Sequence, residues 1–255
     1  MNSAPIIDTH CHTGIHKYEP IEHLLFHMDH SGVSKAVLIQ YNGNSDNSYL
    51  ADCLRRYSDR LKGAMIVAPD DDGTAIRGWV EQGIKGIRLS ADSRAESSDP
   101  MAHWRTANEL NLVVSTFCNP SMLMSPQFSE VVSTFPDLKI VIEHLGGVRQ
   151  DAKPPYEEFA EILKLASYPN LTMKIPGFGE FCRLPHPFKD VPPLVRMAID
   201  AFGPQRLMWG SDYPPVSTRE GYDNSLTFPR EYLSDLSIED RNWIFGRTAL
   251  QIWGI

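Results

Sequence analysis

The sequence predicts a (β/α)8 TIM barrel, a closed ring of parallel strands alternating with helices, formed as a single domain by residues 1–255. Three observations lead to this fold class. The chain has 255 residues, close to the roughly 250 residues typical of such a barrel. Eight short apolar or β-branched runs recur along it, with helically spaced segments between many of them. No Gly-x-Gly-x-x-Gly follows the first run, which disfavours an open sheet that binds a dinucleotide.

The expected strands are short and rich in Val, Ile and Leu, as strands buried on both faces are. They cover residues 4–8, 35–40, 62–69, 85–91, 111–117, 139–147, 170–175 and 206–213. Apolar residues at helical spacing cover 21–32, 47–60, 75–83, 101–110 and 157–168. Because a parallel strand pair needs a crossover connection, this alternation predicts parallel pairing. Two Pro-rich stretches, 149–158 and 182–193, are expected either to cover the site or to be plain surface loops.

Composition restricts the partners and the location of the protein. A net charge of −8 without any Lys/Arg run disfavours nucleic acid as a partner. We find neither the ~20 apolar residues of a membrane span nor the features of a signal peptide, so we expect a cytoplasmic protein without membrane contact. Four widely spaced cysteines fit neither a disulfide framework nor a structural zinc site. A small molecule is the expected partner, and a homo-oligomer is compatible with the sequence.

Polar side chains stand at or near the ends of several expected strands. In a closed barrel the reactive groups gather at the C-terminal ends of the strands. We therefore expect a site at this end, with candidates at His10, His12, Gln40, Arg88, His144, Lys174 and Asp212.

Strand alternation assigns these side chains to faces, because residues two apart point the same way. Asp8, His10 and His12 are expected on one face, with Cys11 turned toward the helices. The same rule turns Glu143 away from His144, so Glu143 is discounted as a carboxylate ligand.

Two imidazoles beside a carboxylate support two kinds of chemistry. His10, His12 and Asp212 can bind a divalent metal such as zinc through nitrogen and oxygen. Imidazoles can equally donate hydrogen bonds to a developing oxyanion. Both alternatives stay open at this point.

The motifs "IIDTHCH", "VLIQYNGNSDNSYLADCLRR", "GIKGIRL", "VIEHLGG" and "WGSDYPP" occur in this order across almost the whole chain. Together they resemble the amidohydrolase-related branch of the metal-dependent hydrolases, in particular the sugar-acid lactonases and the 2-pyrone-4,6-dicarboxylate lactonase group. The resemblance implies that His10 and His12 are the first-strand histidine pair and His144 the sixth-strand histidine. It also implies that Asp212 is the general base and, in metal-bearing members, a ligand, and that Arg88 meets a substrate carboxylate or hydroxyl.

The sequence departs from this pattern at the fifth strand. Metal-dependent members usually carry a histidine at its end, where this chain reads "LVVSTFCNPS", with Thr116 or Cys118 near the missing position. The expected zinc ion, held by His10, His12 and Asp212, would lack one nitrogen ligand. Some lactonases of the group also lack this histidine, and some work without a metal, so the departure favours a lactonase.

We therefore expect a hydrolase that opens the C–O bond of a small carboxylated or polyhydroxylated lactone. Asp212 is the expected general base and His144 its catalytic partner, whereas Arg88, Gln40 and Lys174 are expected to bind substrate. The alternatives are a metal-dependent decarboxylase or hydratase of the same superfamily, a TatD-like nuclease, and a barrel that binds without catalysis.

Overall fold

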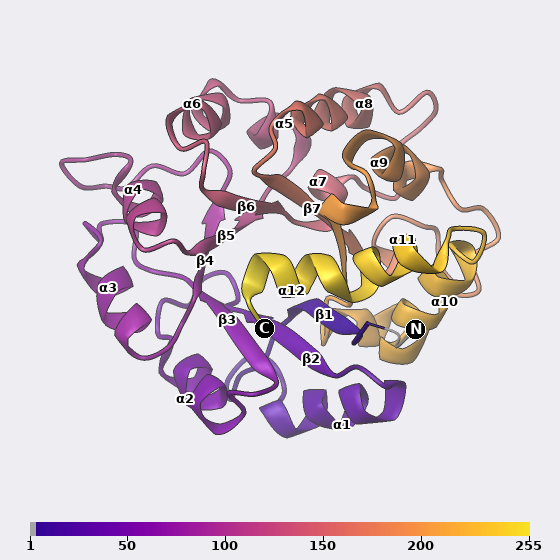
Figure 1. The fold of residues 1–255 in the computed structure, drawn as a ribbon, viewed down its shortest axis with the longest axis horizontal. Coiled ribbons are helices and arrows are strands. Elements are labelled where there is room, and N and C mark those ends of the chain that lie inside the picture. The colour runs from indigo at the N-terminus through magenta and orange to yellow at the C-terminus, as the bar shows by residue number, and fades with distance from the viewer. Residues whose placement is uncertain (1–3) are drawn as a thin grey trace.

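The computed structural model describes residues 4–255, which form a ring of parallel strands surrounded by helices (Figure 1). Each strand pairs with its neighbours in sequence, in the order β1 to β8. The predicted (β/α)8 barrel is confirmed. The predicted domain also included residues 1–3, which lie outside the described residues. The strands are β1 (Ile7–Cys11), β2 (Lys35–Ile39), β3 (Leu61–Met65), β4 (Gly86–Ser90), β5 (Val113–Phe117), β6 (Lys139–Ile142), β7 (Leu171–Pro176) and β8 (Leu207–Gly210).

The ring closes where β1 and β8 end. Cys11 forms a parallel bridge with Tyr213, Asp212 N donates to His10 O at 2.8 Å, and His12 N donates to Tyr213 O at 2.7 Å. Closure needs Gly210, because a Cβ there would lie 2.7 Å from Cβ of His10. The two strand ends that carry the predicted site are thus fastened together by their backbones.

Most helices cover the outside of the barrel, and at least one helix follows each strand, in line with the predicted alternation. The helices pack on alternate strand residues such as Val114 of β5, whereas its neighbour Val113 faces the barrel interior. This double burial explains why the strands read as continuous apolar runs. The helices are α1 (Ile21–Ser31), α2 (Ser48–Arg56), α3 (Thr74–Glu81), α4 (Ala102–Glu109), α5 (Pro120–Leu123), α6 (Pro126–Thr134), α7 (His144–Gly147), α8 (Glu157–Leu163), α9 (Leu194–Phe202), α10 (Tyr222–Tyr232), α11 (Ile238–Asn242) and α12 (Thr248–Trp253).

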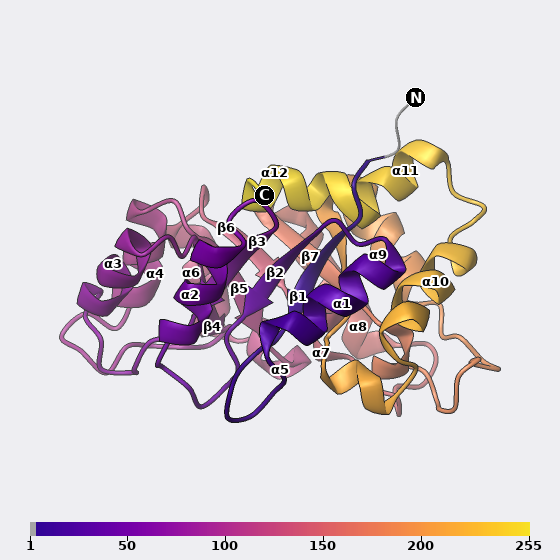
Figure 2. The same ribbon diagram turned by 90° about the horizontal axis from the view of Figure 1, so that it is seen from below.

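The C-terminal helix α12 closes the N-terminal end of the barrel. Figure 1 shows it crossing in front of the strands, and Figure 2 shows α11 and α12 along one end of the molecule, with α5 and α7 near the other. Ala249 and Trp253 of α12 pack against Ile7 and Met208 inside the barrel. The interior is therefore filled from this side, and the strand ends with the polar residues lie at the opposite side.

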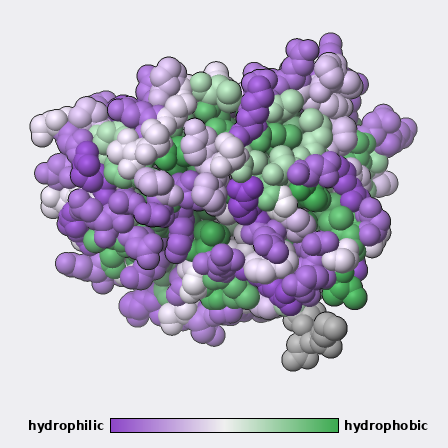
Figure 3. Space-filling model, turned by 45° about the horizontal axis from the view of Figure 1, so that its top comes forward, coloured by the Kyte–Doolittle hydropathy of each residue, from purple (hydrophilic) through white to green (hydrophobic). Residues whose placement is uncertain are grey.

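The outer surface is mixed in character. On the face drawn in Figure 3, hydrophilic residues cover much of the area and hydrophobic residues form small clusters between them. Among residues 4–255, no helix combines the length and the apolar character that crossing a membrane requires.

Candidate active site

A bulge in β1 brings both histidines into the barrel. Four residues of β1, Asp8–Cys11, lie opposite only three residues of β2, Ala36–Leu38, so the register shifts between them. Asp8 therefore turns outward, where its Oδ1 accepts from Ser211 N at 2.9 Å, and the expectation that it shares a face with His10 and His12 is wrong. The prediction for Cys11 is confirmed, because its side chain packs in the apolar layer under the helices.

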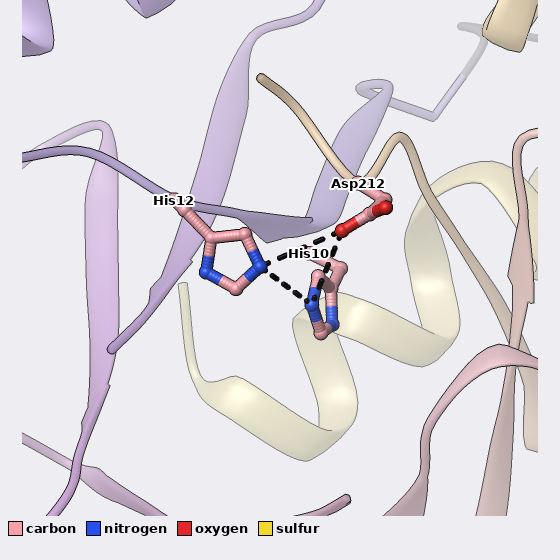
Figure 4. Close-up of side chains that lie close together, drawn as sticks. All are labelled: His10, His12 and Asp212. Carbon is pink, nitrogen blue, oxygen red and sulfur yellow. Dashed lines mark hydrogen bonds and ion pairs between the residues drawn. The ribbon is translucent and has the colours of Figure 1, made fainter. Parts of the chain in front are cut away.

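His10, His12 and Asp212 meet at one point (Figure 4). Nε2 of His10 lies 3.2 Å from Nε2 of His12. Oδ1 of Asp212 lies 3.8 Å from the first of these atoms and 3.5 Å from the second. The ring of Tyr18 stacks on His12 with centroids 5.2 Å apart. The three side chains predicted to form the site are thus brought together by the two ends of the sheet that close the ring.

Asp212 is held by a partner that the sequence did not reveal. Its Oδ2 accepts from Nη2 of Arg219 at 3.0 Å, and Arg219 Nη1 also binds Glu180 Oε2 at 2.6 Å. Burial raises the pKa of Asp212, but contact with His12 and the charges of His144, His12 and Arg219 outweigh it, so the net shift is downward. Asp212 is therefore a carboxylate whose Oδ1 faces the histidines.

A left-handed turn places His144. The residues of the "HLGG" segment have φ angles of +47°, +51°, +72° and +75°. Glycine adopts this conformation freely, whereas the non-glycine residues His144 and Leu145 are strained by it. The turn interrupts strand alternation directly after Glu143, so the His144 ring lies 4.3 Å from the His10 ring by centroids.

Glu143 points into the barrel, and the prediction that it turns outward is wrong. It is 1% exposed. Its carboxylate accepts from Arg88 Nε at 3.1 Å, from Arg88 Nη2 at 2.7 Å and from Ser115 Oγ at 2.7 Å. Burial raises the pKa of Glu143, but the charges of Arg88 and Lys174 and the hydrogen bond from Arg88 lower it well below its usual value. The fork of Arg88, expected to meet substrate, is thus already paired with a buried carboxylate.

Lys174 lies beneath the histidines and is fully buried. Its Nζ is 2.8 Å from Ser115 Oγ and 3.1 Å from His10 Nδ1. Burial lowers the pKa of Lys174 to about 8, because the attraction of Glu143 offsets only part of the desolvation. Burial, followed by the charge of Lys174, also holds the pKa of His10 well below its ordinary value. At neutral pH the pair is therefore an ammonium beside a neutral imidazole.

Gln40 stands at the end of β2, next to this network. Its amide nitrogen donates to Asp46 O at 2.9 Å, and its backbone oxygen accepts from Arg88 Nη1 at 3.2 Å. The side chain is 6% exposed. Gln40 thus borders the site while its amide group holds the loop that follows β2.

The fifth strand presents a different residue from those expected. Cys118 packs in the apolar layer outside the barrel, and Thr116 shares its face by alternation. Ser115 faces the interior instead, between Lys174 and Glu143. Alternation from the buried Val113 could have identified Ser115, whereas Arg219 lies in a loop without a periodic signal.

The three converging atoms fit a metal in spacing but only partly in hydrogen bonding. Zinc bonds of ~2.0–2.2 Å in tetrahedral geometry separate ligands by about 3.3 Å, near the distances found here. A metal-binding histidine donates its other N–H to an acceptor, and His12 meets this requirement because its Nδ1 lies 2.7 Å from Ile39 O. His10 does not, because its Nδ1 faces the ammonium of Lys174. The donor set as it stands therefore does not fit a bound ion at His10.

The two Pro-rich loops face each other. Residues 150–153 of the first and residues such as Arg183, His186 and Lys189 of the second line a cavity of about 620 Å³. Whether these loops cover a bound substrate stays a prediction.

The chain is similar in sequence to proteins whose names describe lactone hydrolases. A 4-sulfomuconolactone hydrolase from Rhizobium radiobacter is 25% identical over 203 residues, 76% of this chain and 66% of that protein. An L-fucono-1,5-lactonase from Burkholderia ambifaria is 28% identical over 221 residues, 75% of this chain and 68% of that protein. The matched part of this chain spans just under two thirds of the first relative's length.

Solved structures share the fold. A crystal structure of an amidohydrolase from Burkholderia multivorans, with zinc bound, has a TM-score of 0.81 at 19% identity and covers 99% of this chain and 100% of that chain. The family described as Amidohydrolase matches residues 7–255, almost the entire length. The resemblance inferred from the motifs is confirmed, and the chain belongs to the amidohydrolase family.

Proposed function

We propose that this protein hydrolyses the ester bond of a small lactone. The observation that carries the proposal is the convergence of His10, His12 and Asp212, in which one carboxylate oxygen is held by Arg219 and the other is directed at both imidazoles. The names of the two curated relatives support this substrate class, since both act on lactones. No observation on residues 4–255 favours decarboxylation, hydration or nuclease chemistry over hydrolysis.

In the proposed reaction, Asp212 removes a proton from a water molecule that attacks the lactone carbonyl carbon. The imidazoles stabilise the oxyanion that forms, as hydrogen-bond donors aimed at developing charge do. Collapse of the tetrahedral intermediate breaks the ring C–O bond, and Asp212 returns the proton to the leaving alkoxide. The product is the open-chain hydroxy acid, so water is the only co-reactant.

Other residues have positioning roles in this proposal. His144, partly exposed and beside His10, is placed to contact the carbonyl oxygen or the attacking water. Arg88 and Gln40 border the site and would bind the acidic or hydroxylated part of a substrate. Arg88 would do so through guanidinium N–H groups that do not bind Glu143. Lys174 is fully buried, so its effect on a substrate would pass through His10.

If the protein bound a divalent ion such as zinc, His10, His12 and Asp212 would be its ligands. The zinc in the crystal structure from Burkholderia multivorans supports this choice of metal. The hydrogen bonding of His10 opposes it, and the proposed steps use only the side chains of the protein.

The test is an Asp212→Asn variant assayed on a panel of sugar-acid lactones and carboxylated muconolactones. General acid–base catalysis contributes about 10²–10⁴-fold, so we expect kcat to fall at least about 100-fold. Asp200→Asn on the exposed side of α9 is the matched control and should retain full activity. Proton NMR of the products separates hydrolysis from ring isomerisation. Wild-type activity in Asp212→Asn, or a rearranged lactone as the sole product, would contradict the proposal.

A further inference from the structure

Lys174 is a buried cation for which the proposed reaction has no direct use. Its Nζ lies inside the barrel, with the ring of Trp253 from α12 at 6.0 Å on one side. On the other side are Ser115 Oγ at 2.8 Å and His10 Nδ1 at 3.1 Å. A buried ammonium is costly unless its protons are donated, and these two atoms are its hydrogen-bond partners among the described residues.

The direction of each hydrogen bond in this group follows from its chemistry. The Glu143 carboxylate only accepts, so the single hydroxyl proton of Ser115 goes to Glu143 Oε1 at 2.7 Å. Ser115 Oγ must then accept from Lys174. An ammonium has no lone pair, so its contact with His10 Nδ1 is also a donation. A neutral His10 that accepts at Nδ1 carries its proton on Nε2.

The neighbouring ring has a hydrogen-bond partner of its own. His12 Nδ1 lies 2.7 Å from the carbonyl oxygen of Ile39, which only accepts, so Nδ1 of His12 carries a proton. Nε2 of His10 lies 3.2 Å from Nε2 of His12, so a proton on Nε2 of His10 points into the site.

We propose that Lys174 is a positioning residue that keeps the proton of His10 on Nε2, making His10 an N–H donor into the site and disfavouring a metal ion there. A metal at Nε2 of His10 needs a lone pair on that atom and a proton on Nδ1, which would then face the ammonium. Metal binding at His10 therefore requires that the Lys174 ammonium lose a proton or move away from its position between Trp253 and Ser115. The donor role toward a carbonyl oxygen rests on the proposed function, whereas the position of the proton does not.

The first test is zinc affinity, measured by competition with a chromophoric chelator at neutral pH. Lys174→Met keeps the length of the side chain and removes the ammonium, and the Arg88–Glu143 pair stays balanced in charge. We expect zinc to bind Lys174→Met at least tenfold more tightly than wild type. Thr172→Val, on the same face of β7, is the matched control and should change affinity less than twofold. Adding His12→Asn to Lys174→Met should abolish the gain, which places the ion at the site.

The second test uses the wild-type protein and does not depend on a variant folding. Two-bond ¹H–¹⁵N correlation spectra of ¹⁵N-histidine-labelled protein report which ring nitrogen carries the proton, with His10 assigned by its loss in a His10→Asn variant. We expect Nε2 to be protonated in His10 and Nδ1 in His12. A His10 protonated on Nδ1, or zinc affinity in Lys174→Met no higher than in wild type, overturns the proposal. Neither readout involves a lactone, so failure here is distinguishable from failure of the proposed hydrolysis.

Discussion

Glu143→Gln is the sharpest test of the ionic network beneath the site. Glu143 is 1% exposed, and its carboxylate accepts two hydrogen bonds from Arg88 and one from Ser115. The amide of Gln is neutral and offers one accepting oxygen, so Arg88, itself only 8% exposed, loses its counter-charge. Removing one partner of a buried ion pair costs about 3–5 kcal/mol. For a chain of this size, 1 kcal/mol corresponds to about 2–4 °C, so the midpoint of heat unfolding should fall by about 6–20 °C.

The assay is thermal unfolding followed by circular dichroism, with urea unfolding as a second measure. Glu109→Gln is the matched control, because Glu109 pairs with Arg77 on the surface, where the two side chains are 47% and 50% exposed. Such exposed pairs contribute about 0–1 kcal/mol. A loss below about 1 kcal/mol in Glu143→Gln, equal to the control, would refute the reasoning that desolvation makes this pair strong.

The stability of Glu143→Gln should also depend on pH differently from that of wild type. The charges of Arg88 and Lys174 outweigh burial and lower the pKa of Glu143 in the folded protein below its ordinary value of 4.5. A group with a lowered folded-state pKa contributes stability that is present above its ordinary pKa and lost as the pH falls. Wild type should therefore lose stability between roughly pH 5 and pH 3 more steeply than Glu143→Gln. Parallel pH profiles for the two proteins would contradict this sign.

Two further predictions concern the site. Gly210→Ala would place a Cβ 2.7 Å from that of His10 and 2.9 Å from its backbone nitrogen; displacement of His10 should reduce kcat/KM at least tenfold, and overpacking should cost about 1–3 kcal/mol of stability. Unchanged kinetics would show that β1 and β8 can separate without disturbing His10. Removal of metals by a chelator should leave lactone hydrolysis intact, because Lys174 occupies the acceptor position that a metal-bound His10 needs. Loss of activity that zinc restores would contradict this expectation.

Local patterns in the sequence determined the barrel and the position of its site. Strand runs and helical spacing depend on neighbouring residues, and all eight expected strands are present with ends shifted by a few residues. Polar residues at strand ends predicted that His10, His12 and Asp212 would meet, because the C-terminal ends of barrel strands share one rim. The ordered motifs identified the family.

Tertiary structure decided which way the side chains at these ends point. Alternation fails where the backbone departs from an ideal strand, at the bulge between Asp8 and Cys11 and at the left-handed turn that begins at His144. The turn explains how both Glu143 and His144 reach the site from adjacent positions. Partners such as Arg88 for Glu143, 55 residues apart, are set by closure of the ring and leave no periodic trace in the sequence. The sequence therefore determined where the candidate site lies, and three-dimensional packing determined which side chains pair within it.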